Sequence, residues 1–177
     1  NFTGTVWNTG IMRHGKYYSI DTESNYDGKP ITLGEILQDE SDVPEKYFLT
    51  DPAKLEKFQY LRGPKKIERT SADGHSYIYS EGGMSPYDDL NLPGRTMLTS
   101  EGTVNRSTHF LFVNNRYRLI TPIEAERLQD FPDDWTAKKQ LADGSVVDVS
   151  DKMRMFFMGN ALVTEIVKEI GNFIKIL

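Results

Sequence analysis

Few side chains in this sequence are able to act as nucleophiles or to bind a metal ion. The chain of 177 residues contains no cysteine, which excludes a disulfide scaffold, a thiolate metal site and a cysteine nucleophile within it. Its three histidines, at positions 14, 75 and 109, lie far apart and show no metal-ligand spacing. Each is more typical of a polar surface residue than of a ligand. We therefore expect no metal site and no catalytic residue in this chain.

Basic residues are concentrated in two segments of an otherwise acidic chain. Residues 54–69 carry six lysines and arginines against two glutamates, and residues 95–118 carry four arginines against one glutamate. The segments hold net charges of +4 and +3, so the rest of a chain of net charge −5 carries −12. Such segments can form a localised phosphate-binding face. The charges alone leave equally open that both are ordinary solvated surface.

The stretch RLITPIEAERLQDFPDDW, residues 118–135, contains a helix with strong end signals. Thr121 can cap its N-terminus, Pro122 suits the first helical position, and Glu124 can close a capping box with Thr121. Pro132 disfavours further helix. On these features alone the stretch is typical of a surface helix with well-defined ends.

Residues 162–177 carry apolar side chains at helical spacing, which predicts a strongly apolar helix that packs on a larger body. Asn160 is a good N-cap for this helix. Free backbone N–H groups at that end favour a carboxylate or a phosphate. The alternative is a capped core helix without a ligand.

The other expected elements are short. Residues 1–30 indicate strands and loops with turns at His14-Gly15 and Asp27-Gly28. Helices are expected at 32–38, with a capping box between Thr32 and Glu35, and at 52–63. Strands are predicted at HSYIYS (75–80), RTMLTS (95–100), HFLFV (109–113) and RYRLI (116–120), with a turn at Asn114-Asn115.

With 38% hydrophobic and 27% charged residues, the composition is that of a globular protein of one domain, or of one domain and a piece of another. No apolar run approaches the length of a membrane span. The first ten residues lack a signal-peptide pattern and an initiator Met, which favours a piece of a longer protein. We expect a cytoplasmic protein without a membrane partner.

Two motifs, in order, resemble conserved motifs of the DNA cytosine-5 methyltransferases. Residues 118–133 are similar to the ninth motif, roughly R-x-L-T-P-x-E-x-x-R-L-Q-G-F-P-D, with Ile120 and Asp130 in place of the usual Leu and Gly. FFMGNALVTEI, residues 156–166, resembles the tenth motif, G-N-[AS]-V, with Leu162 in place of Val. The resemblance covers essentially the whole chain but only the C-terminal part of such an enzyme.

Segments before these motifs also resemble the family's variable target-recognition region. ITLGEIL (31–37) is similar to its opening, and GRTMLTSEG (94–102) resembles the R-T-[IL]-x-T segment near its end. YLRGPKKIER and YSEGGMS further resemble members that modify GG-N-CC or GG-W-CC sites.

The resemblance implies an α/β fold in two parts. Residues 1–120 would form a mainly-β target-recognition domain with short helices. Residues 121–177 would supply C-terminal helices that complete a Rossmann-like, S-adenosylmethionine-dependent methyltransferase domain. The family's Gly-rich cofactor loop, Pro-Cys nucleophile, Glu-Asn-Val acid and Gln-x-Arg-x-Arg motif do not occur here. Because the chemistry needs a thiolate that adds to cytosine C6, this chain alone should not methylate DNA.

The resemblance also implies roles for individual residues. A structural scaffold is expected from Arg118, Thr121, Pro122, Glu124 and Arg127. Positions that border S-adenosylmethionine in the complete enzyme are Phe131, Asn160, Ala161 and Leu162. Expected DNA-binding residues are Arg95, Thr96, Gly102, Arg106, Lys65 and Lys66.

Within the DNA-binding set, at least one of Arg95 and Arg106 is expected to contact a guanine if the target contains GG, since Arg is the usual reader of guanine O6 and N7. Thr96 is expected to hold a phosphate near the flipped base, and Gly102 to let the backbone approach a groove. The alternative for Arg95 is a strand residue paired with an acid.

The leading hypothesis is the target-recognition portion of a bacterial-type DNA cytosine-5 methyltransferase of a restriction-modification system. Its partners would be double-stranded DNA and a missing N-terminal catalytic half or a separate catalytic subunit. The alternatives are a non-catalytic DNA-binding module or regulatory remnant of that family, and a decayed remnant without binding activity.

Overall fold

The structure, a computed structural model, describes residues 7–25 and 28–174. The chain divides into two compact units, residues 1–30 and residues 31–177, and each is considered by itself. In the first unit, β1 (Thr9–Arg13) and β2 (Lys16–Ile20) form an antiparallel hairpin. The turn predicted at His14-Gly15 is confirmed and has positive φ at both residues, 50° and 74°. The turn predicted at Asp27-Gly28 includes Asp27, which lies outside the described residues.

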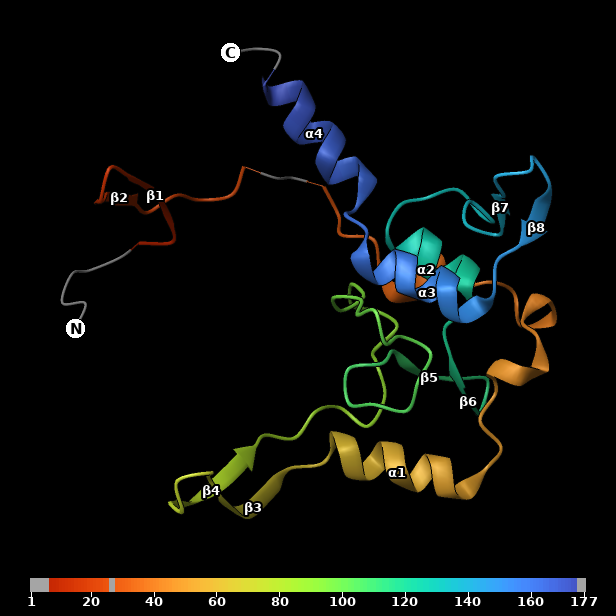
Figure 1. The fold of residues 1–177 in the computed structure, drawn as a ribbon, viewed down its shortest axis with the longest axis horizontal. Helices are drawn as coiled ribbons and strands as arrows, with labels where there is room; N and C mark the ends of the chain where they lie inside the picture. Colours follow the sequence, from red (N-terminus) through yellow and green to blue (C-terminus); the bar gives the residue numbers. More distant parts are fainter. Residues whose placement is uncertain (1–6, 26–27, 175–177) are drawn as a thin grey trace. The chain divides into compact units, whose positions relative to one another are not determined.

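The second unit combines short helices with two-stranded antiparallel sheets (Figure 1). Its main elements in chain order are the 3-10 helices η1 (Leu33–Ile36), η2 (Glu40–Asp42) and η3 (Glu45–Tyr47), then α1 (Pro52–Arg62), β3 (Lys65–Thr70), β4 (Ser76–Glu81), β5 (Phe110–Val113), β6 (Arg116–Leu119), α2 (Pro122–Leu128), β7 (Lys138–Gln140), β8 (Val146–Asp148), α3 (Asp151–Asn160) and α4 (Thr164–Ile174). The expected mixture of helices and small sheets is confirmed.

The core of the second unit lies where α2, α3, η1 and β5 meet. Its fully or nearly buried members are Leu33, Ile36, Met97, Leu111, Ile120, Ala125, Met155 and Met158. Both sequence motifs therefore contribute to one core, together with Leu33 and Ile36 of the segment expected to open a recognition region.

One predicted strand is wrong. Residues 95–98 have no regular secondary structure, residues 99–100 lie in a turn, and the segment pairs with no strand among the described residues. This segment packs instead against α3, where a Cβ at Gly159 would collide with the backbone of Leu98 and Thr99. Strands β3, β7 and β8 were not predicted.

The N-cap role predicted for Asn160 is also wrong. Asn160 is the last residue of α3, and its Nδ2 donates back to Phe156 O at 2.9 Å. The chain becomes extended at Ala161, with ψ of 159°, and α4 begins only at Thr164. The apolar helix predicted for 162–177 is therefore shorter, and residues 175–177 lie outside the described part.

The domain boundary predicted at residue 120 falls inside the second unit, so the division of roles at that point stays a prediction. Within the described residues, no helix is both long and apolar enough to cross a membrane. The first six residues of the segment considered for a signal peptide lie outside the description.

Candidate functional site

A buried ion pair joins β6 to the start of α2. Arg118 donates from Nη1 and Nη2 to the two carboxylate oxygens of Glu124, each at 2.7 Å, and both side chains are at most 2% exposed. Glu124 also accepts the backbone N–H groups of Thr121 at 2.8 Å and Gln38 at 2.9 Å. The capping box of Thr121 and Glu124 is confirmed, with Pro122 as the first helical residue. The carboxylate of Glu124 thus both closes the capping box and pairs with Arg118, which was predicted as a scaffold residue.

Arg127 fixes the other end of α2. Its Nε and Nη2 each donate at 2.7 Å to the carboxylate of Asp133, beyond a turn in which Asp130 has φ of 61°. Its Nη1 donates at 3.2 Å to two backbone carbonyls at the end of η1. The motif residues named as a scaffold therefore hold α2 against β6 and η1.

A second buried ion pair joins α2 to α3 and was not predicted. Arg154 Nη2 lies 2.9 and 3.0 Å from the carboxylate oxygens of Glu126, whose side chain is fully buried. Burial alone would lower the pKa of Arg154, but the Glu126 carboxylate outweighs it and raises that pKa. No local signal reveals the pair, because its members lie 28 positions apart in the sequence.

The four residues predicted to border the cofactor come from the ends of α2 and α3. Gln129 ties these ends together by donating from Nε2 to a backbone carbonyl of α3 at 2.9 Å. Ala161 and Leu162 line a groove of about 490 Å³, and Leu162 is 74% exposed. Phe131 is half-buried and Asn160 is exposed, and neither lines this groove.

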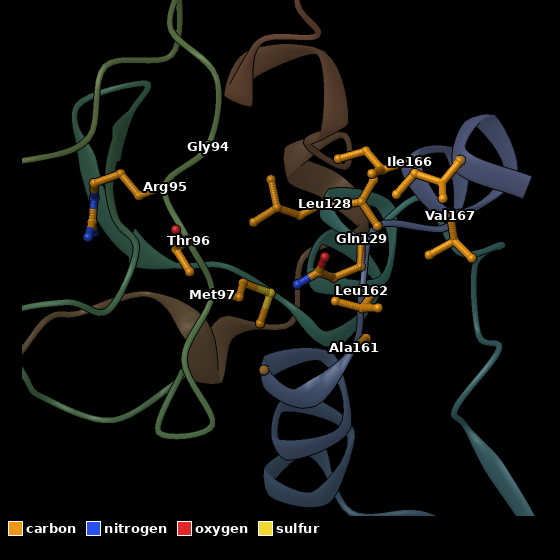
Figure 2. A pocket seen from close by; sticks show the side chains of 13 residues that line it. Gly94, Arg95, Thr96, Met97, Leu128, Gln129, Ala161, Leu162, Ile166 and Val167 are labelled. Carbon is orange, nitrogen blue, oxygen red and sulfur yellow. The ribbon is translucent and has the colours of Figure 1, made fainter. Parts of the chain in front are cut away.

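Residues 94–97 form the opposite side of the groove from Leu162 (Figure 2). Thr96 is exposed there, and its hydroxyl has no hydrogen-bond partner in the part of the chain that the structure describes. The guanidinium of Arg95 points away from Leu128 in Figure 2. It donates to Asp88 from Nε at 2.6 Å and from Nη2 at 3.1 Å. Pairing with an acid, the alternative for Arg95, is what the structure shows, although no strand is present.

Asp88 is shared by three segments of the second unit. Besides Arg95, it accepts Arg62 Nη2 and the backbone N–H of Phe110, each at 2.8 Å. Burial alone would raise the pKa of Asp88, but hydrogen bonds from Arg95 and Arg62 outweigh it and lower that pKa to about 2. This carboxylate therefore stays ionised and fixes the segment that carries Thr96.

Gly102 has φ of 79°, as suits a glycine in a tight loop, and it is exposed. The preceding Glu101 is buried and accepts the backbone N–H of His109 at 2.7 Å. Its other oxygen lies 3.1 Å from His109 Nδ1. The expectation that His109 is a surface residue is wrong, because Glu101 supplies a buried partner; His14 and His75 are exposed.

Lys65 and Arg106, both predicted to bind DNA, pair with the same carboxylate in this structure. Lys65 Nζ lies 2.9 Å from Glu81 Oε2 and 2.7 Å from Leu61 O, and its side chain is 9% exposed. Arg106 Nε lies 3.2 Å from Glu81 Oε1, its Nη1 donates to Leu61 O at 2.8 Å, and its Nη2 donates to Gly82 O. Lys66, in contrast, is exposed.

The family model described as C-5 cytosine-specific DNA methylase matches residues 9–175 of the chain. Over 175 residues the chain is 53% identical to the type II methyltransferase M.Sau3AI of Staphylococcus aureus. That alignment covers 99% of the chain and 39% of the relative, so the chain spans about two fifths of the length of that protein.

Proposed function

Because the chain belongs to the family of C-5 cytosine-specific DNA methylases, we propose that it is the target-recognition portion of a DNA cytosine-5 methyltransferase. The complete enzyme transfers a methyl group from S-adenosylmethionine to C5 of a cytosine in a specific duplex site, as part of a cytoplasmic restriction-modification system. The observation that carries the proposal is the family match over residues 9–175 of a chain without cysteine. The likeness to enzymes of GG-N-CC or GG-W-CC sites stays a prediction.

The nucleophile of the reaction has to come from outside this chain. A thiolate must add to cytosine C6 before C5 becomes nucleophilic, and none of the 177 residues is a cysteine. The match to about two fifths of M.Sau3AI leaves room for a further catalytic portion or subunit. This chain therefore contributes recognition and part of the wall of the active-site cleft.

S-Adenosylmethionine supplies the methyl group when it is bound in the complete enzyme. The residues present here fit one wall of its site. Phe131 offers a half-buried aromatic face, Leu162 an exposed apolar side chain, and Asn160 an exposed amide whose Oδ1 is left after Nδ2 bonds to Phe156 O. Ala161, Phe131 and Asn160 belong to the ends of α2 and α3 that Gln129 ties together. Since one wall is not a pocket, the isolated chain should not bind this cofactor measurably.

Exposed apolar side chains on α3 and α4 support a large partner surface. On α3 these are Met153, Phe156 and Phe157, and on α4 they are Ile166, Val167, Ile170, Phe173 and Ile174. Exposed apolar side chains gathered on a helix in this way mark an interaction site. We assign it to the catalytic portion, whose Rossmann-like domain the C-terminal helices from residue 121 onward would complete, while residues 1–120 recognise DNA.

DNA recognition is assigned to residues that remain accessible and to those that position them. Thr96, Gly102 and Lys66 are exposed and suit direct contacts with the backbone of DNA. Lys65, Arg95 and Arg106 already have carboxylate partners, so a direct contact with DNA requires each to exchange them.

The test is reconstitution with a catalytic portion that contains the Pro-Cys nucleophile. We expect the two portions together to methylate duplex DNA at one sequence, measured by sequencing of bisulfite-treated DNA, and neither portion alone to do so. DNA binding by this chain without methylation in the reconstituted mixture would favour the non-catalytic binding module. Neither binding nor methylation would favour a decayed remnant.

A further inference from the structure

The arginines of the second unit differ in whether a carboxylate already holds them. Seven of the eight arginines among residues 31–174 form ion pairs, namely Arg62, Arg95, Arg106, Arg116, Arg118, Arg127 and Arg154. Arg69 is the remaining one, and no ion pair or hydrogen bond of its guanidinium is found among the described residues. Since arginine reads guanine by donating two hydrogen bonds, a guanidinium with free N–H groups is the best suited reader.

Arg69 lies on a projecting antiparallel ribbon made of β3 and β4, residues 65–81. The ribbon extends from the end of α1 (Figure 1). Along it, Arg69 pairs with Tyr77, and Ile67 pairs with Tyr79. Because side chains alternate across a strand, these four lie on one face of the ribbon.

The guanidinium of Arg69 is oriented without being hydrogen-bonded. Its carbon lies 4.1 Å from the centroid of the Tyr79 ring, a cation–π contact. Such stacking fixes the position of a guanidinium and leaves its N–H edge available. Arg69 and Tyr77 are exposed, so this edge faces solvent.

Ion pairs and hydrogen bonds attach the base of the ribbon to the rest of the second unit. Lys65 and Arg106 both pair with Glu81, and both donate to Leu61 O at the end of α1. Arg106 also donates to Gly82 O, just after β4. These contacts order both strands where they leave the body and therefore fix the direction in which Arg69 is presented.

We propose that the β3–β4 ribbon enters the major groove of the target site and that Arg69 reads a guanine there through O6 and N7. The major groove of B-DNA accommodates a two-stranded ribbon. Six residues of strand at about 3.4 Å each give roughly 20 Å of reach. The inference rests on the proposed function, and it assigns the specificity-determining role to a residue outside the two conserved motifs.

The experiment uses the complete enzyme that contains this chain, with its methylated site first identified by bisulfite sequencing. Arg69→Ala should weaken binding to the cognate duplex roughly tenfold to a hundredfold and leave non-cognate binding nearly unchanged. Arg69→Lys should recover little, because an ammonium lacks the planar fork. Replacing the contacted guanine by 7-deazaguanine should weaken wild-type binding and have little further effect on Arg69→Ala.

The matched control is Lys66→Ala on the opposite face, which should weaken cognate and non-cognate binding alike. Equal losses for both duplexes in Arg69→Ala would overturn the inference, as would no loss or a target site without guanine. An unchanged unfolding midpoint of Arg69→Ala excludes misfolding as the cause of a loss. A wild-type enzyme that neither binds nor methylates duplex DNA would instead refute the proposed function.

Discussion

Charged side chains serve opposite purposes around α2 and along the β3–β4 ribbon. Around α2, Arg118 and Arg154 are buried against Glu124 and Glu126, and these contacts hold α2 to β6 and α3. On the ribbon, charges are paired only at its base, and Arg69 farther along is exposed with its N–H groups free. The ion pairs around α2 hold elements together, whereas the ribbon exposes the guanidinium of Arg69 to solvent.

A basic segment of the sequence is therefore not uniformly available to bind DNA. Within residues 54–69, Arg62 is buried on Asp88 and Lys65 is paired with Glu81, whereas Arg69 is free to bind a ligand. Net charge counts all three residues equally. Only the partner of each guanidinium or ammonium separates the structural cations from the available ones.

Removing the negative charge of Glu124 should cause the largest loss of stability. Glu124→Gln leaves Arg118 buried without a countercharge, and breaking a buried pair in this way costs about 3–5 kcal/mol of unfolding free energy. Urea unfolding of this chain measures the loss. The same substitution on the ribbon, Glu68→Gln, removes an exposed charge and should change stability by less than about 0.5 kcal/mol.

Similar small effects of both substitutions would contradict the assignment of α2 as a charged scaffold. A large loss for Glu68→Gln would show that the ribbon is held by more than its base.

The carboxylate of Asp88 makes stability depend on acid pH. Its pKa is lowered from the ordinary 3.8 to about 2, so its stabilising effect is fully present above pH 3.8 and is lost as pH falls through about 2. A shift of nearly two pKa units corresponds to about 2 kcal/mol. Urea unfolding at several pH values should show this loss. In Asp88→Asn the same interval should be flatter, and an identical pH profile would refute the role of Asp88.

The sequence predicted the features that depend on near neighbours. The capping box of Thr121 and Glu124, the turn at Asn114-Asn115 and the helix after Asp51 all follow from residues within a few positions. Both asparagines of that turn have positive φ, at 48° and 61°. Local hydrogen bonds and backbone preferences decide such elements, so the sequence is sufficient for them.

Contacts between residues far apart in the sequence could not be predicted from such local patterns. Arg106 meets Glu81 across 25 positions, and Arg62 meets Asp88 across 26. The segment at residues 95–100 has strand composition but finds no partner strand, because Gly159 brings α3 onto its backbone. Tertiary packing therefore decided which of the predicted DNA-binding residues remained accessible.

Substitution of Arg106 separates a positioning role from base reading. Arg106→Ala removes the contacts to Glu81, Leu61 O and Gly82 O at the ribbon base. We expect a loss of about 1–2 kcal/mol in binding of the complete enzyme to its cognate site, with reduced discrimination because Arg69 is no longer well placed. Competition binding with cognate and singly substituted duplexes measures both quantities.

Positioning predicts that discrimination falls at the base pair affected by Arg69→Ala, and that the double variant loses little more than Arg69→Ala alone. Loss of discrimination at a different base pair would show that Arg106 releases its partners and reads DNA directly, as the sequence first indicated.

The smallest expected effect is on the salt dependence of DNA binding, and it should distinguish two adjacent lysines at the start of the ribbon. Lys66 is exposed, whereas Lys65 is 9% exposed and pairs with Glu81. If Lys66 neutralises one phosphate, Lys66→Ala should make the log–log dependence of affinity on salt concentration shallower by about 0.9, because one fewer counterion is released. Lys65→Ala should leave that slope unchanged. The measurement is a salt titration of the complete enzyme on non-cognate duplex. A slope that changes for Lys65→Ala and not for Lys66→Ala would mean that Lys65, on the same face as Arg69, leaves Glu81 to neutralise a phosphate, and that Lys66 makes no contact with the backbone of DNA.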